Sequence, residues 1–295
     1  MTGGSGFIGR ATVAAMDPRK FEIHATYFEN PTEAGPGHAA WHPLQLMDVD
    51  AVNALVKRIR PTHLVSLAWY TRDRGHFVMP ENLDWVRATL HLTQAFVANG
   101  GRRAVYAGTY GEYGVAEGVL NERTKTAPAS LYAICKDALH RIIAGYAPLT
   151  RLTYSWARIF SVYGPHDAPY RVVPYALGRL LAGHEALLTE GRQVRDFIHV
   201  ADVGRALARI AGSDLTGPVN VGSGEGHAVR EVMQLLGEAT GGLQRLRFGA
   251  IEQAPGETQR IVADVGCLRG IGWSPQYHLR TGLADTIAWF RSRHS

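Results

Sequence analysis

A cluster of glycines in the first nine residues constrains the fold more than any other feature of this chain. The stretch TGGSGFIG (2–9) has the spacing G-x-x-G-x-x-G. Such a loop joins a buried strand to a helix, and its bare backbone lets a pyrophosphate approach the helix N-terminus. We therefore predict a dinucleotide-binding loop that comprises Gly3, Gly6, Phe7, Ile8 and Gly9.

The strand that should precede this loop is missing, because only Met1 and Thr2 stand before the first glycine. A parallel sheet that lacks this strand leaves backbone N–H and C=O groups unpaired. We expect either that the natural chain carries a few more apolar residues before Met1, or that Met1 is the tail of the strand. The intact mass of the native protein tests the first alternative.

Strand patterns and helix patterns alternate through the first half of the chain. We expect strands over 21–28, 62–69, 102–110 and 152–160, and helices over 11–16, 51–59, 83–101 and 130–147. This order predicts an α/β fold with a Rossmann-type, doubly wound, mostly parallel sheet. We assign residues 1–160 to the dinucleotide-binding domain, with returns from about 193–222, and residues 161–295 to a smaller substrate-binding lobe.

The charge and the cysteines narrow the classes of partner. The formal net charge is +5, yet Lys and Arg form no run of five, which favours an anionic small molecule over nucleic acid. Cys135 and Cys267 have no metal-ligand spacing, so we expect no metal site and a reducing compartment. The absence of a long apolar run or a leader predicts a cytoplasmic protein without a membrane partner.

The strand over 21–28 should end beside the adenosine ribose, where the residue type separates the two dinucleotides. An acidic residue there binds the 2′-OH of NAD, whereas Arg binds the additional phosphate of NADP. Tyr27 stands near the expected place, with Glu29 two positions on and Arg10 just behind the glycine loop. We expect NADP or NAD as the cofactor, with a small preference for NADP.

Three polar residues form a candidate catalytic group. Tyr132 and Lys136 lie four residues apart in a helical pattern, so their side chains share one face. We expect the Lys136 ammonium to lower the pKa of the phenol from about 10 towards neutrality, so that Tyr132 exchanges a proton with an alcohol or ketone. Thr109 ends the strand over 102–110, at the sheet edge where such folds bind ligands.

The ordered motifs of the chain resemble those of the extended short-chain dehydrogenase/reductases that modify nucleotide sugars, the NAD-dependent epimerase/dehydratase family. The resemblance covers nearly the whole length. It rests on TGGSGFIG (2–9), LMDVD (46–50), LAW (67–69), ENLDWV (81–86), AGTYGEYG (107–114), YAICK (132–136), RIFSVYGP (158–165), RDFIHVADV (195–203) and NVGSG (220–224).

This resemblance implies roles for further residues. Asp48 and Val49 would meet the adenine, and Ala68 would line the cofactor path. Arg195 would grip the diphosphate of the substrate, with help from Arg171. The expected substrate-binding residues are Trp69, Asn82, Thr109, Ser161, Arg171 and Arg195.

Several of these positions keep a second interpretation. Asn82 would shape the site, or it would cap the helix that follows. Each arginine would bind the substrate or form an ion pair within the protein. Trp69 would pack on the sugar, or on the core or the rim of the site. Ser161 stands where many relatives place an asparagine, so its phosphate contact is in doubt.

The residues after Thr109 bear on the reaction type. In the 4,6-dehydratases of this family the next two residues are typically acidic, whereas this chain has Tyr110 and Gly111. Glu112 comes one position later and, on a strand, would face the other side. Dehydration is therefore disfavoured.

Three functions fit the sequence. The carboxyl-terminal half is similar to CDP-abequose-synthase-type C4 ketoreductases, so we expect NAD(P)-dependent reduction of the C4 keto group of a nucleoside-diphosphate deoxysugar. The alternatives are a nucleotide-sugar 4-epimerase that retains NAD, and a noncatalytic dinucleotide-binding protein. The family habit also implies a homodimer, formed by the helices over 83–101 and 130–147.

Overall fold

The computed structural model describes residues 1–28, 37–71, 73–253 and 256–294. The strands are β1 (Ile23–Tyr27), β2 (Ala39–Pro43), β3 (His63–Ser66), β4 (Arg103–Thr109), β5 (Gly118–Leu120), β6 (Thr153–Ile159), β7 (Ser161–Tyr163), β8 (Ala186–Leu188), β9 (Val194–Arg195), β10 (Phe197–His199), β11 (Gly217–Val221), β12 (His227–Ala228), β13 (Leu246–Phe248) and β14 (Arg260–Ala263).

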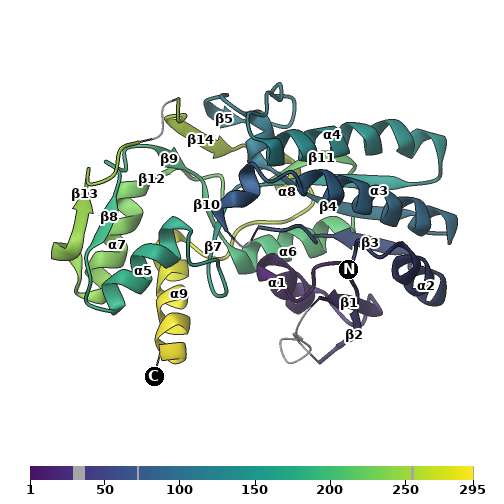
Figure 1. The fold of residues 1–295 in the computed structure, drawn as a ribbon, viewed down its shortest axis with the longest axis horizontal. Coiled ribbons are helices and arrows are strands. Elements are labelled where there is room, and N and C mark those ends of the chain that lie inside the picture. The colour runs from purple at the N-terminus through teal and green to yellow at the C-terminus, as the bar shows by residue number, and fades with distance from the viewer. Residues whose placement is uncertain (29–36, 72, 254–255, 295) are drawn as a thin grey trace.

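The α-helices are α1 (Phe7–Ala15), α2 (Val49–Ile59), α3 (Asn82–Ala98), α4 (Leu131–Tyr146), α5 (Val172–Leu181), α6 (Val200–Ala211), α7 (Val229–Thr240), α8 (Gly266–Gly270) and α9 (Leu279–His294). The short 3-10 helices are η2 (Arg74–Phe77), η3 (Tyr110–Tyr113), η4 (Ala147–Leu149) and η5 (Leu243–Arg245). Figure 1 shows the main sheet with its helices in one lobe, and α5, α7 and α9 in the other.

A parallel sheet in the order β11-β6-β4-β3 forms the centre of the larger lobe. Its middle pair runs from Arg103 opposite Thr153 to Thr109 opposite Ile159. Because every pairing in this sheet is parallel, the connections cross over through helices, and the carboxyl ends of the strands meet at one edge. The predicted Rossmann-type α/β class is confirmed.

Met1 and Thr2 lie between β1 and β3 and join the β1-β2 pair to the main sheet. The Thr2 N–H donates to the Val65 carbonyl at 2.9 Å, and the Thr26 N–H donates to the Met1 carbonyl at 3.0 Å. Thr2 also forms a parallel bridge with Ser66. These residues therefore make the contacts of a strand end, directly before the glycine loop.

Helices cover both faces of the main sheet, and β4 shows how its residues divide between them. Val105 packs in a core with α1 and α6, whereas Ala104 and Tyr106 pack in a second core with α2, α3 and α4. Both sets are buried, which explains why the strand reads as a continuous apolar run and not as an alternating one.

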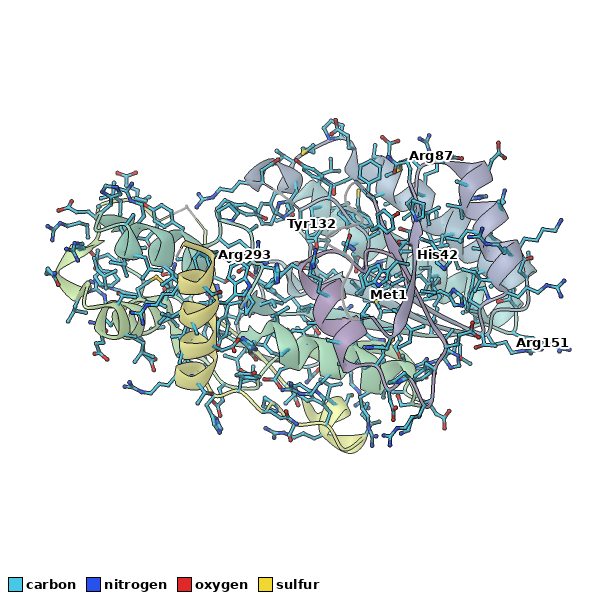
Figure 2. The ribbon with its side chains drawn as sticks, turned by 90° about the horizontal axis from the view of Figure 1, so that it is seen from below. Met1, His42, Arg87, Tyr132, Arg151 and Arg293 are labelled. Carbon is cyan, nitrogen blue, oxygen red and sulfur yellow. The ribbon has the colours of Figure 1, made fainter. Side chains whose placement is uncertain are left out.

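A separate core holds the smaller lobe together. Side chains of α5, α7 and α9 pack against the parallel pair β8-β13. Strand β14 lies between β5 and β9, so segments far apart in the sequence meet where the lobes join. Figure 2 shows Tyr132 toward the middle of the molecule, whereas Arg151 points outward at its edge. Within the described ranges, no helix combines the length and apolarity that crossing a bilayer requires.

Two elements differ from the sequence expectations. Strand β2 lies in a stretch for which the sequence predicted no strand, because AAWHP is only partly buried and contains no β-branched residue. Helix α1 begins at Phe7, four residues before the expected start, since the helix follows the glycine loop directly.

The contact between α1 and α6 predicts a stability effect. A Cβ on Gly204 of α6 would lie 2.4 Å from the Ala11 carbonyl carbon of α1. We expect Gly204→Ala to lower the free energy of unfolding by about 1–3 kcal/mol, because the two helices must separate. Gly145→Ala in α4 is the matched control: its Cβ meets nothing within 4 Å, so it should raise stability by up to ~1 kcal/mol. Urea unfolding measures both, and equal effects would contradict the close packing.

Candidate functional site

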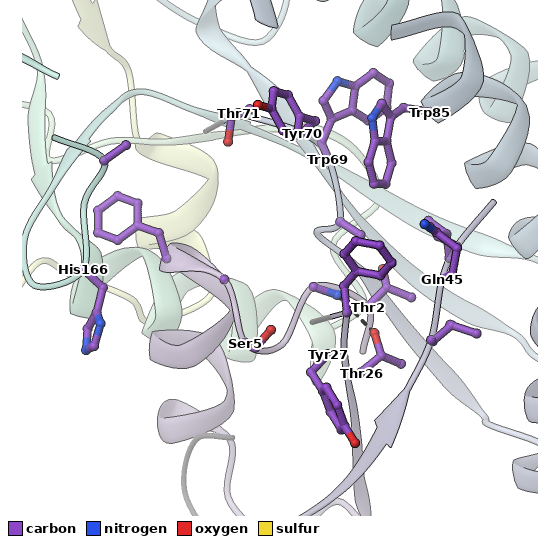
Figure 3. Close-up of a pocket in the computed structure, with 18 of the residues that line it drawn as sticks. Thr2, Ser5, Thr26, Tyr27, Gln45, Trp69, Tyr70, Thr71, Trp85 and His166 are labelled. Carbon is purple, nitrogen blue, oxygen red and sulfur yellow. Dashed lines mark hydrogen bonds between the residues drawn. The ribbon is translucent and has the colours of Figure 1, made fainter. Parts of the chain in front are cut away.

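A cavity of about 920 Å³ opens beside the glycine loop. Figure 3 shows Tyr27, Gln45 and Thr26 on one side of it, Trp69, Tyr70 and Trp85 on another, and His166 opposite. The lining residues are Thr2, Gly3, Ser5, Gly6, Phe7, Thr26, Tyr27, Phe28, Leu44, Gln45, Leu46, Met47, Ala68, Trp69, Tyr70, Thr71, Trp85, His166, Asp167, Ala168, Pro169 and Arg171.

The backbone of the glycine loop is shaped for close approach. Gly3 has φ +69°, and a Cβ there would lie 2.8 Å from the Ala68 nitrogen. A Cβ on Gly9 would lie 2.0 Å from the Gly3 carbonyl oxygen, so only glycine lets α1 start this close to the loop. Gly6 caps α1 without a side chain, which leaves the first-turn N–H groups to a ligand. These features fit the pyrophosphate of a dinucleotide.

The structure brings part of the expected cofactor set to the cavity. Its lining includes Gly3, Gly6, Phe7, Tyr27 and Ala68 from that set. Ile8 and Gly9 lie just behind, in α1.

Two residues expected to meet the adenine, Asp48 and Val49, are not among the residues that line the cavity. The Asp48 carboxylate caps α2 by accepting the Ala51 N–H at 2.9 Å, and Val49 is exposed on the same helix. Leu44 and Met47 line the cavity in their place. The motif LMDVD (46–50) does lie at the cavity. Within it, Leu46 and Met47 line the cavity, whereas Asp48 caps α2. Glu29 lies outside the described residues.

Thr109 and Tyr132 meet beside this cavity. The Thr109 side chain caps η3 by accepting the Gly111 N–H at 3.2 Å. Ser130 caps α4 through the Ala133 N–H, so Tyr132 falls in the first turn of the helix. The Thr109 side chain lies close enough to the Tyr132 hydroxyl to act on its pKa, which it lowers. The two predicted residues therefore lie together in the structure.

The Tyr132 phenol is not acidified in the way the sequence suggested. Burial raises its pKa, the charge of Glu112 adds to the rise, and Arg171 acts in the opposite direction. The Lys136 Nζ instead donates to the Ala107 carbonyl at 2.8 Å and lies 5.8 Å from the Tyr132 ring centroid. The expectation that Lys136 lowers the phenol pKa towards neutrality was wrong for this state, because desolvation outweighs the neighbouring charges.

Lys136 itself is strongly affected by its surroundings. Burial lowers the pKa of its ammonium to about 7, against a smaller opposite effect of Glu112. Its Nζ lies 3.8 Å above the centroid of the Trp69 ring. The cation is thus held by a carbonyl and an aromatic face rather than by a direct ion pair.

Aromatic rings enclose Tyr132. Trp69, His76 and Phe77 each approach its ring edge-on, with centroid distances of 6.1, 5.2 and 6.1 Å. Asn82 holds this wall: its Oδ1 accepts the Trp69 Nε1–H at 2.8 Å, and its Nδ2 donates to the His76 and Met79 carbonyls. The sequence analysis did not predict His76 and Phe77 as site residues. They lie in η2, between the motifs LAW (67–69) and ENLDWV (81–86), and no sequence signal marks this short helix.

Asn82 therefore shapes the site and does not cap the helix. The cap of α3 is Glu81, and Asn82 is the first helical residue. Its amide is fully engaged by protein partners, and it is buried. These contacts give Asn82 a role in holding the aromatic wall, and its substrate-binding role stays a prediction.

Glu112 is part of a buried network and not of the cavity. It lies in η3 rather than on the expected strand. Oε1 accepts the Thr109 N–H and the Trp156 Nε1–H, both at 2.9 Å, and Oε2 accepts the Arg158 Nε–H at 2.8 Å. Burial raises the pKa of Glu112 against the effect of Arg158.

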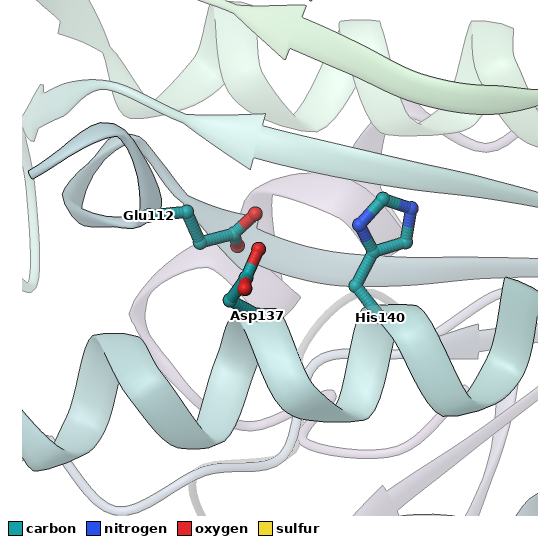
Figure 4. A group of neighbouring side chains, drawn as sticks. All are labelled: Glu112, Asp137 and His140. Carbon is teal, nitrogen blue, oxygen red and sulfur yellow. The ribbon is translucent and has the colours of Figure 1, made fainter. Parts of the chain in front are cut away.

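Asp137 and His140 approach Glu112, as Figure 4 shows. One ligand atom of each residue lies within 4.8 Å of the others. Glu112 already accepts three hydrogen bonds, and the Asp137 carboxylate accepts the Arg141 Nε–H at 2.7 Å. The donor set is therefore used within the protein, which gives no support for a metal ion there.

The two arginines predicted to bind the substrate differ in their partners and in their access to the cavity. Arg195 is buried, and its guanidinium donates to Glu257 at 2.8 Å and to the Val194 carbonyl at 2.9 Å. Arg171 lines the cavity and has its Nε 3.4 Å from the buried Asp167. The ion-pair interpretation thus describes Arg195 in this state. Ser161 pairs in β7 with Phe197 of β10 and does not line the cavity.

A glycine loop at a helix N-terminus and a Tyr-Lys-Thr group at the carboxyl edge of a parallel sheet define a dinucleotide-dependent enzyme fold. The family model of the NAD dependent epimerase/dehydratase family matches residues 1–222. The chain therefore belongs to this family, whose members include NAD-dependent enzymes that act on nucleotide sugars.

Individual relatives cover most of the chain. A UDP-glucose 4-epimerase from Azospirillum brasilense is 27% identical over 99% of this chain and 91% of its own length. A dTDP-glucose 4,6-dehydratase from Actinoplanes sp. is 29% identical, over 65% of this chain and only 61% of its own length. The UDP-glucose 4-epimerase from Thermus thermophilus, solved in complex with NAD, is 28% identical in sequence to this chain. The two structures superpose with a TM-score of 0.86 over 98% of this chain and 97% of the epimerase.

Burial of Lys136 predicts a pH-dependent stability. Its pKa is about 7 in the folded chain and about 10.4 when unfolded. Between these values the unfolded chain binds the additional proton, so stability rises with pH across this window and the full cost is present below pH 7.

We expect Lys136→Met to raise the free energy of unfolding at pH 7 by roughly 1–3 kcal/mol, less near pH 10. Urea unfolding at both pH values measures the difference. A variant that is less stable than the wild type at pH 7 would show that the ammonium is well solvated or well paired.

Proposed function

We propose that the protein interconverts epimers at C4 of a nucleoside-diphosphate sugar, with NAD retained through the cycle. The observation that carries this proposal is the grouping of Tyr132, Thr109 and Lys136 next to Trp69, which lines the cavity beside the glycine loop. Two 4-epimerases that match nearly the whole chain support it. NAD, when bound, supplies the acceptor and donor of hydride.

The phenolate form of Tyr132 takes the proton of the C4 hydroxyl during oxidation, and the resulting phenol returns it during reduction. Thr109 holds the same sugar oxygen, because its hydroxyl already reaches the phenol. Lys136 supplies positive charge one helical turn away and a donor for a ribose hydroxyl. Arg171, which lines the cavity and lies 3.4 Å from the Asp167 carboxylate, binds the diphosphate through its guanidinium.

Oxidation and reduction at a single carbon need no further acid or base, and this agrees with the state of Glu112. Loss of water from the sugar needs a carboxyl group free to move a carbon-bound proton. The Glu112 carboxylate accepts three hydrogen bonds within the protein. We therefore favour C4 chemistry without dehydration.

The ketoreductase is the second candidate, and one observation favours it. Segments GRQVRDFI (191–198), FGAIEQ (248–253) and GWSPQYHLRTGL (272–283) resemble those of C4 ketoreductases that act on deoxysugar nucleotides. In that case the reduced cofactor, NADPH or NADH, is consumed and released with each turnover.

The state of the cofactor distinguishes the two functions. We expect the purified protein to carry close to one NAD per chain that survives dialysis, and to consume no added NADPH while it converts a nucleotide sugar. Mass spectrometry of the released nucleotide and absorbance at 340 nm measure these. Stoichiometric NADPH consumption with a 4-ketosugar nucleotide would instead establish the reductase.

Tyr132→Phe tests the proton carrier. We expect kcat to fall by about 10²–10⁴-fold, because the ring remains and only the acid–base group is lost. NAD content should be unchanged. Tyr146→Phe, at the other end of the same helix, is the control and should turn over normally. Near-normal turnover by Tyr132→Phe would refute the assignment.

We also propose a homodimer through α3 and α4, which lie side by side in Figure 1. Leu83, Ile134 and Ile142 are 60%, 45% and 47% exposed on these helices, more than expected of apolar side chains on a solvent face. We expect the wild type to elute as a dimer in light-scattering chromatography, and Ile134→Glu with Ile142→Glu to elute as a monomer. A monomeric wild type would exclude this interface.

A further inference from the structure

Trp69 contacts both Lys136 and the cavity. Trp69 lines the cavity, whereas Lys136 does not. The Lys136 Nζ lies 3.8 Å above the Trp69 ring centroid, and the indole stacks near Trp85 at 6.2 Å. Its Nε1–H is fixed by the buried amide of Asn82 at 2.8 Å. The ring is thus held from several sides in contact with the ammonium.

Three other groups act on the positive charge of Lys136. From β4, the Ala107 carbonyl accepts one hydrogen bond. From η3, the charge of Glu112 favours the protonated form of Lys136 without direct contact, and the Glu112 carboxylate itself accepts a hydrogen bond from Arg158. On α4 itself, the Tyr132 ring centroid is 5.8 Å away. Burial works against the charged form of Lys136, so the aromatic face of Trp69 and the Ala107 carbonyl are the direct contacts that compensate for it, as in other desolvated cation–π pairs.

We propose that Trp69 is a positioning residue whose indole face keeps Lys136 protonated and oriented beside Tyr132. This rests on the proposed function for its catalytic meaning, since Lys136 assists Tyr132 only while it is charged. It goes beyond the expected contact of Trp69 with the sugar, because it assigns the ring to the protein's own lysine.

The protonation of Lys136 can be measured without any turnover. Lys20, Lys57, Lys125 and Lys136 are the lysines of the chain, so protein labelled with ¹³C at lysine Cε gives a simple spectrum, and Lys136→Met assigns the signal. We expect the Lys136 midpoint near pH 7 in the wild type. Trp69→Leu, which removes the π face, should lower it by about one pH unit.

Two further variants make the result specific. Trp69→Phe keeps an aromatic face and should shift the midpoint less than Trp69→Leu. Trp289→Leu removes another indole that lies under a cation, Arg293 at 5.0 Å on α9, and should leave the Lys136 midpoint unchanged. A midpoint unmoved in Trp69→Leu, in a protein whose spectrum is otherwise folded, would overturn the proposal.

The pH profile of turnover links this contact to the reaction. Activity that needs charged Lys136 falls as pH rises through its pKa, so the alkaline limb should move to lower pH in Trp69→Leu by the shift seen in the spectra. A shifted midpoint with an unshifted profile would leave Trp69 as the holder of Lys136 but contradict the catalytic role of the lysine. Tyr132→Phe tests the proposed reaction separately, because its loss of activity does not depend on the contact between Trp69 and Lys136.

Discussion

The geometry of the site depends on one ion pair inside the larger lobe. Glu112 and Arg158 have side chains that are 0% and 4% exposed, and their charged groups meet at 2.8 Å. The same carboxylate accepts the Thr109 N–H and so ends β4 where the hydroxyl can reach Tyr132. Removal of one partner would leave a buried charge at a cost of about 3–5 kcal/mol. Glu112 thus fixes the position of Thr109 beside Tyr132, the candidate acid–base residue.

The second constraint is the closeness of backbone segments at the glycine loop. Gly3, Gly9 and the Ala68 backbone approach so closely that a methyl group would not fit. From the other side of the cavity, the Tyr170 hydroxyl donates to the Thr71 carbonyl at 2.9 Å, and Arg74 donates to the Tyr170 carbonyl. The segment after β3 and the segment after β7 therefore enclose the ligand space from both lobes.

The sequence predicted the fold well because its strongest signals are local. Glycine spacing, the apolar run of β4 and the helical spacing of Tyr132 and Lys136 each survive in the structure. The acidity of Tyr132 could not be predicted, because it depends on burial. Nor could the roles of Asn82 and Glu112, since each is set by partners distant in sequence: Trp69 for one, and Trp156 and Arg158 for the other.

In the reaction that we propose, the Tyr132 phenol moves a proton to and from a sugar oxygen, and the hydrogens bound to the sugar carbons do not exchange with water. Turnover of a nucleotide sugar in deuterium oxide, followed by NMR of the product, tests it most directly. We predict a product with its hydrogens at C4, C5 and C6 retained, because hydride is carried within the site and Glu112 is locked in the core. Solvent deuterium at C5 or C6 would contradict this, because it requires a base acting on carbon.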